Sequence, residues 1–246
     1  SGPSAGVLRT DQAPPLSIPA SFFLVAPVAM IASGVLLASS DVVLVSRLMP
    51  FAMAATHLGT LGFLGALMLG ALYQMIPVVA GVPVPWVRLA HVVHALFVAG
   101  LGMLVAGLAL GTPTLLVVAS IALLAALLLF LGPVAVALVR APATNETVWG
   151  MRLAVVGLMA IAALGTVMAR ARAGIVEVGG DWRGWVSAHA VLGGVVWVGG
   201  LITAVSWQVV PMFYLTPPLP RWSCWATLAA LGLALLVVPS VLLVGG

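Results

Sequence analysis

Long, predominantly apolar stretches constrain this chain more than any other feature of its sequence. They recur from Ser17 onward, and only short polar or proline-containing segments separate them. An apolar run of about 20 residues is long enough to cross a bilayer as one helix. Counting these runs predicts an all-α, polytopic membrane protein with seven transmembrane helices in one bundle. The runs are too long for a β-barrel, whose strands alternate in polarity over about ten residues.

The turn-forming breaks define the expected boundaries. We predict spans at Ser17–Ser40, Phe51–Val79, Trp86–Leu110, Pro113–Arg140, Trp149–Ala169, Trp185–Met212 and Trp222–Val244. Residues 1–16 are polar and proline-rich, so they are expected to form a flexible tail. Residues 17–246 are expected to form a single transmembrane domain.

Composition narrows the possible chemistry. Only 6% of the residues are charged, against about a quarter in soluble domains. The nine basic residues are all arginine, so no lysine is present for Schiff-base chemistry. These arginines are scattered over loops and helix ends, which favours a lipid bilayer and not nucleic acid as the partner. A single cysteine, Cys224, excludes an internal disulfide and a Cys-x-x-Cys-His attachment of haem.

The second and sixth predicted spans share one plan. Each carries a histidine near its start, His57 or His189, and a Gln-x-x-Pro element near its end. Both spans begin on the same side of the membrane, so the two imidazoles are expected at similar depth. Facing imidazoles from two helices are what axial ligation of a haem b requires. A metal ion such as copper, or ordinary hydrogen bonds to neighbouring helices, would suit the same residues.

Two further histidines, His91 and His94, begin the third span on the opposite membrane side. Their i, i+3 spacing puts them on one helix face, so they cannot hold opposite faces of one haem. Tyr73 and Gln74, at the end of the second span, are expected beside them. A second metal site or an interfacial polar belt would both suit this group. His94, the deeper of the two histidines, is also a candidate haem ligand.

The most charged connection runs from Arg170 to Gly184 and leads directly into the sixth span. It is therefore expected on the side of His57 and His189. If a haem lies there, Arg170, Arg172 and Arg183 are candidates to bind its propionates through charge-assisted hydrogen bonds.

The stretch from His57 to His94 resembles a segment of subunit I of the haem-copper oxidase superfamily, which includes cbb-type oxidases, nitric oxide reductases and NnrS-like proteins. The matching elements are His57, Tyr73, Pro77, Ala80-Gly81, Pro83, Arg88-Leu89 and His94. The resemblance assigns the His57 position to copper. This chain has no adjacent histidine pair, and the late H-x-H motif is reduced to His189. It therefore implies one haem or one metal site and no binuclear centre.

These observations predict a b-type haem protein of a bacterial inner membrane, engaged in electron transfer or in handling nitric oxide or oxygen. A haem-dependent oxidoreductase is one form of this function. The expected partner is a respiratory redox partner or a quinone, and a homo-oligomer is a further candidate. Two alternatives stay open: a transporter of metal or small solutes, and an assembly subunit of a respiratory complex.

Overall fold

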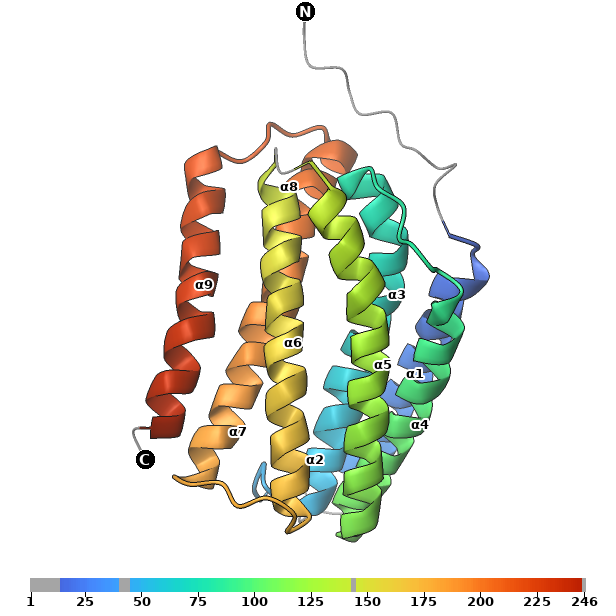
Figure 1. Ribbon diagram of the computed structural model, residues 1–246, viewed down its shortest axis with the longest axis vertical. Helices are drawn as coiled ribbons and strands as arrows, with labels where there is room; N and C mark the ends of the chain where they lie inside the picture. The colour runs from blue at the N-terminus through green and yellow to red at the C-terminus, as the bar shows by residue number, and fades with distance from the viewer. Residues whose placement is uncertain (1–13, 40–44, 143–144, 245–246) are drawn as a thin grey trace, which may run out of the picture.

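The computed structural model describes residues 14–39, 45–142 and 145–244. This part of the chain is helical throughout apart from its connections and contains no β-strand, and seven of its helical segments are long and apolar enough to cross a membrane (Figure 1). The predicted all-α, seven-span bundle is confirmed. Most of the predicted N-terminal tail, and the last two residues of the predicted domain, lie outside the described residues.

Five spans are continuous α-helices: α1 (Ser17–Ala38), α4 (Leu89–Leu110), α5 (Pro113–Arg140), α6 (Glu146–Arg172) and α9 (Arg221–Val244). The other two change helix type along their length. Span two, Pro50–Ala80, consists of α2 (Pro50–His57), the π-helical segment Leu58–Gly65, α3 (Ala66–Met75) and the π-helical segment Ile76–Ala80. Span six, Trp182–Tyr214, consists of α7 (Trp182–Val191), the π-helical segment Leu192–Gly199 and α8 (Gly200–Tyr214).

Several predicted boundaries differ from the observed ones by up to three residues, as where the fifth span begins at Glu146 and the sixth at Trp182. The third span does not begin at Trp86, which lies in a turn with φ of 49°, a value that an α-helix excludes. Its helix begins at Leu89 instead. The fifth span extends past Ala169 to Arg172, so Arg170 and Arg172 belong to the last turn of α6 and not to the loop.

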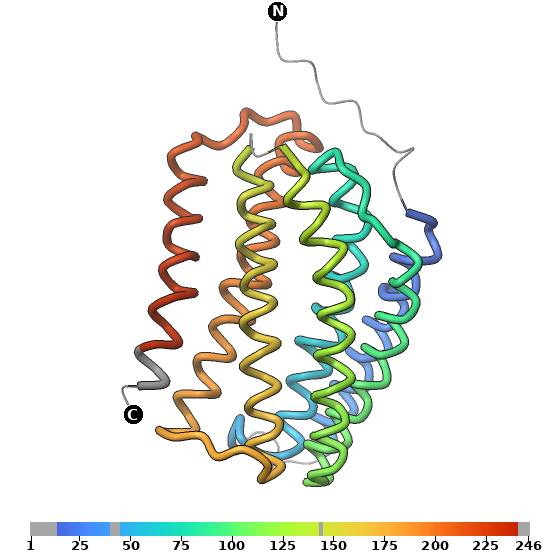
Figure 2. The backbone as a smooth tube through the Cα atoms, viewed as in Figure 1, coloured from blue at the N-terminus to red at the C-terminus, as the bar shows by residue number. Residues whose placement is uncertain are grey.

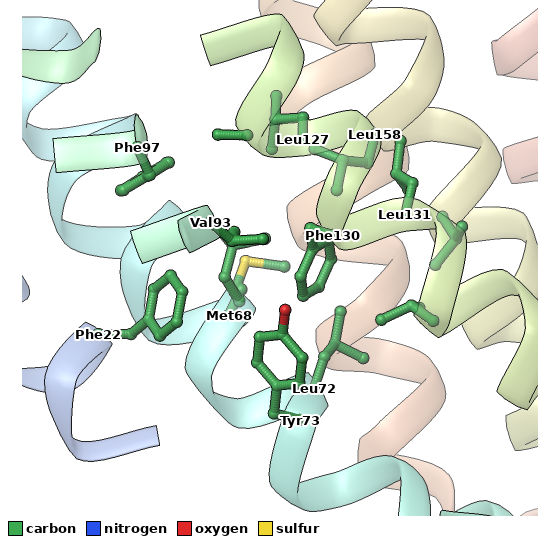
Figure 3. Packing of buried hydrophobic residues seen from close by; sticks show 14 of the residues in the cluster. Phe22, Met68, Leu72, Tyr73, Val93, Phe97, Leu127, Phe130, Leu131 and Leu158 are labelled. Carbon is green, nitrogen blue, oxygen red and sulfur yellow. The ribbon is translucent and has the colours of Figure 1, made fainter. Parts of the chain in front are cut away.

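Helix packing depends on small residues at the contacts. A Cβ atom added to Gly100 of α4 would lie 2.8 Å from Leu123 of α5, and one added to Gly107 would lie 2.9 Å from Leu116. Such close approach maximises van der Waals contact, which holds helices together where lipid removes the hydrophobic driving force. Between α3, α4 and α5 lies the centre of the core, where the Tyr73 and Phe130 rings meet edge to face with centroids 5.3 Å apart (Figure 3).

The chain contains an internal repeat centred on spans two and six. Gln74 and Gln208 are 134 residues apart, and the same offset relates Pro77 to Pro211 and the π-helical segment Leu58–Gly65 to Leu192–Gly199. It also relates α4 to α9. Each repeat is therefore an ordered set of three spans: α1, span two and α4, then α6, span six and α9.

Side-chain contacts repeat as well. A close contact between the first and second spans occurs in each repeat. A Cβ atom added to Gly62 of span two would lie 2.6 Å from Ala29 of α1, and a Cβ atom added to Gly157 of α6 would lie 2.8 Å from Val196 of span six. Gly62 and Val196 are equivalent under the offset of 134 residues, so Ala29 of α1 corresponds to Gly157 of α6. The corresponding spans of the two repeats run in the same direction, and α5 connects the repeats (Figures 1 and 2).

Candidate functional site

The structure brings the imidazoles of His57 and His189 together. Their ring centroids lie 6.3 Å apart and their planes are inclined by 33°. The two residues are 132 positions apart in sequence and come from different repeats, so only the packing of the bundle places them side by side. The predicted juxtaposition of these histidines is confirmed, while their role as ligands stays a prediction.

Local helix geometry holds the first imidazole. His57 is the last residue of α2, directly before a π-helical segment, and π-helical turns are frequent at functional sites. Its Nδ1 lies 2.8 Å from the carbonyl oxygen of Met53, one turn earlier. Because a carbonyl only accepts, Nδ1 carries the proton and donates. Nε2 is then left with its lone pair available to a metal.

The second imidazole lacks such a partner. Nδ1 of His189 is buried and has no hydrogen-bond partner among the described residues. The ring packs against Gly165 of α6, where only a glycine leaves room for it. A buried polar atom without a partner is costly in an apolar environment. Binding of a group that accepts this nitrogen as a ligand would remove the cost.

The separation of the rings suits one metal centre between them. Metal–imidazole bonds are about 2.0 Å and the ligating nitrogen lies about 1.1 Å from its ring centroid, so opposed ligands have centroids about 6.2 Å apart. The observed 6.3 Å is the same separation. The distance alone matches two imidazoles on one metal centre, and it does not distinguish the iron of a haem from a two-coordinate metal ion.

Among the described residues, no larger cluster of metal-binding side chains surrounds the pair. In the described ranges there is no group of three or more His, Cys, Asp or Glu side chains that could hold a metal ion. A copper site built from the described residues would have two imidazoles as its only ligands from these residue types. A haem, in contrast, would need no further ligands from these residue types, because its macrocycle supplies four ligands of its own.

Arginines lie at the same end of the bundle. The connection between α6 and α7 lies at the end where span two starts (Figure 1), so its predicted side is confirmed. The Nε atom of Arg170 is buried and has no partner in the described part of the chain, whereas Arg172 and Arg183 are exposed. Sequence reasoning missed Arg47, whose guanidinium donates to the Ser187 hydroxyl at 3.3 Å. The sequence did offer a signal for it, because Arg47 lies ten residues before His57 and therefore at the same end of span two.

The other two histidines do not join this site. They lie near the start of α4, at the opposite end of the bundle (Figure 1). The His94 Nε2 lies 3.1 Å from the backbone carbonyl of Ser21 in α1, and its ring packs edge-on against Phe22. His91 is exposed. For His94, hydrogen bonding to a neighbouring helix is thus what the structure shows.

The polar residues predicted beside these histidines, Tyr73 and Gln74, do not form a site with them. Gln74 is exposed, but the Tyr73 side chain is 1% exposed and its hydroxyl has no partner among the described residues. Phe22 separates Tyr73 from His94, with ring centroids 6.0 Å and 5.2 Å away respectively. These residues therefore form no shared polar site.

Comparison with known proteins gives no match to this chain, whether among family models, curated proteins or solved structures.

Proposed function

We propose that this chain is a membrane-embedded b-type haem protein in which His57 and His189 are the two axial ligands. The observation that carries the proposal is the approach of their partly buried imidazoles, with centroids 6.3 Å apart. The unpartnered Nδ1 of His189 supports it, since the lone pair of a buried imidazole nitrogen can be donated to a bound metal.

When bound, the haem would supply one-electron redox chemistry. The residues of the chain would fix its position and its electronic state. Met53 orients the His57 ring through its carbonyl oxygen, and Gly165 sets the position of the His189 ring. With both axial positions taken by imidazole, electron transfer is favoured over gas binding, because nitric oxide or oxygen could bind only after one histidine left.

The resemblance to haem-copper oxidase subunit I supports a place in a bacterial inner membrane and an exchange of electrons with a respiratory partner or a quinone. The chain has His57 and His189 but lacks the adjacent His-His motif of that family, which matches a relative that holds a single haem. Arg170 would bind a propionate, because its buried Nε has no other partner in the described residues.

The test is the visible spectrum of the protein purified from a haem-producing host. A low-spin Soret band is expected, and both His57→Ala and His189→Ala should lose or convert it. His94→Ala is the matched control, since its ring belongs to the opposite end of the bundle, and it should keep the spectrum. Retention of an unchanged low-spin spectrum in both site variants contradicts the proposal.

Copper is the alternative occupant of the same pair. Metal analysis of the purified protein separates the two cases, because copper without haem would move the proposal to a two-imidazole metal site. Loss of that copper in His57→Ala and His189→Ala, but not in His94→Ala, would assign it to these residues.

A transporter of metal or small solutes is a second candidate, favoured by the internal repeat. Parallel repeats related by an axis along the membrane normal occur in several transporter families, with the substrate site at the interface between repeats. In that case the purified protein would carry no haem, and liposomes containing it would take up solute. His57→Ala and His189→Ala would then impair uptake.

A further inference from the structure

The internal repeat is incomplete on one side of the bundle. Helix α5 packs against α4 of the first repeat and α6 of the second. If the two repeats exchanged places, α4 would take the position of α9 and α6 that of α1. A helix equivalent to α5 would then lie between α9 and α1, where the described residues provide none.

Burial of equivalent positions shows that this side is open. Val155 and Leu158 of α6, a helix that packs against α5, are 8% and 4% exposed, and Leu158 lies beside Leu127 and Leu131 of α5 (Figure 3). Because Ala29 of α1 corresponds to Gly157 of α6, the counterparts of Val155 and Leu158 are Pro27 and Met30 of α1. Pro27 is exposed and Met30 is 45% exposed.

Helix α9, which borders the open side opposite α1, is also less covered than its counterpart α4. Gly100 of α4 is buried under Leu123 of α5. Its counterpart in α9, at the offset of 134 residues, is Ala234, which is partly exposed. The faces of α4 and α6 that border α5 are thus buried, whereas the equivalent faces of α9 and α1 are exposed or partly exposed.

We infer that the face between α1 and α9 is a docking site for one transmembrane helix of a partner subunit, lying as α5 lies against α4 and α6. The residues identified on this face, Pro27, Met30 and Ala234, carry no charge, so the partner helix must be apolar there. The buried face of α5 gives its pattern: residues alternating three and four apart, at Leu116, Ala119, Leu123, Ala126 and Phe130. This spacing is that of a helix seam packed against neighbours.

The probe is a synthetic peptide with the sequence of α5, residues 113–140, carrying a donor fluorophore. The full chain carries an acceptor at a cysteine introduced as Ala32→Cys in a Cys224→Ser background, and both are placed in lipid nanodiscs. Saturable energy transfer with one peptide per chain is the expected result. A peptide of the same composition in shuffled order should give only the signal of random mixing.

Specificity is tested with two bulky substitutions. Met30→Trp narrows the proposed site and should weaken peptide binding about tenfold or more, since close approach drives association in lipid. Leu128→Trp is the matched control, because Leu128 is 54% exposed on the outer surface of α5. It should leave binding unchanged. Helical circular dichroism of both variants checks that the bundle is intact.

Three outcomes would overturn the inference. One is an absence of saturable transfer, which leaves lipid as the occupant. Another is equal weakening by Met30→Trp and Leu128→Trp, which puts the peptide elsewhere. The third is self-association of the full chain through this face, seen as disulfide-linked dimers of a Met30→Cys variant in the Cys224→Ser background. That result would make a second copy the occupant.

Discussion

A Cβ atom on Gly165 would lie 2.9 Å from Cε1 of His189, so this imidazole lies directly against the backbone of α6. Real Cβ atoms essentially never approach another carbon atom this closely, so the ring would have to move to accept even a methyl group. The packing of α6 against α7 therefore sets where one of the two paired imidazoles lies.

The first prediction follows from this contact. Gly165→Ala should displace the His189 ring and weaken haem retention about tenfold, the lower end of the range for changes that disturb the orientation of a metal ligand. Haem release to apomyoglobin measures the effect. Gly132→Ala is the control, because a Cβ at Gly132 meets no atom within 4 Å. Equal retention in the two variants would contradict a positioning role for Gly165.

Arg170 should contribute more to cofactor retention than the other arginines of the predicted propionate site. Its Nε is buried without a partner, whereas Arg172 and Arg183 are exposed and their ion pairs would be screened by water. Arg170→Gln is expected to speed haem release, and the double variant Arg172→Gln/Arg183→Gln to change it little. The opposite order would remove Arg170 from the site.

Tyr73 offers a test that does not depend on any cofactor. Its hydroxyl is buried in the apolar core with no partner among the described residues, as Figure 3 illustrates. Tyr73→Phe should therefore stabilise the protein, by about 1 kcal/mol or somewhat more, through removal of an unsatisfied polar group. Tyr73→Ala should destabilise it by leaving a cavity beside Phe130. Unfolding in mixed detergent measures both, and a destabilising Tyr73→Phe would indicate a bound partner for the hydroxyl.

Arg152 should matter for stability and not for the histidine site. Its guanidinium donates to the carbonyl oxygens of Leu138 and Ala141 at the end of α5, at 2.7–3.0 Å, and lies 4.8 Å from the centre of the Trp149 ring. Arg152→Met should lower the free energy of unfolding by about 2 kcal/mol, since charged donors contribute more than neutral ones. Arg140→Met, at an exposed arginine of the same end, is the control. An unchanged haem spectrum is expected in both.

The number and type of spans were predictable because each apolar stretch has to satisfy its backbone within one helix. The approach of His57 to His189 was predictable too, since both begin spans that start on one side. Sequence did not reveal the π-helical segments, because glycine-rich apolar helices look alike whatever their turn. It also suggested a site for His94, whose actual partner, the Ser21 carbonyl, is a backbone atom that only the packing of α1 supplies.

The repeat was visible in sequence only in spans two and six, where glycine, glutamine and proline coincide. Its extension to the flanking helices could not be read, because leucine, alanine and valine at most positions carry no distinguishing pattern. The pairing of Ala29 with Gly62 and of Gly157 with Val196 identified it. The identity of the group that the histidine pair binds could not be predicted from the sequence either, since imidazole is a ligand for both iron and copper.

The π-helical segments beside the two histidines give this chain tolerance to changes in its length. A π-helical turn contains a surplus residue compared with an α-helical turn. Deleting one residue from Leu58–Gly65 would let that turn revert to α-helix while the helices on both sides keep their neighbours. The same deletion within α3 would rotate the remainder of the span by about 100°. Length variation by one residue is thus accommodated in the π-helical segments, including those next to His57 and His189, and is disfavoured within the α-helical parts of these spans.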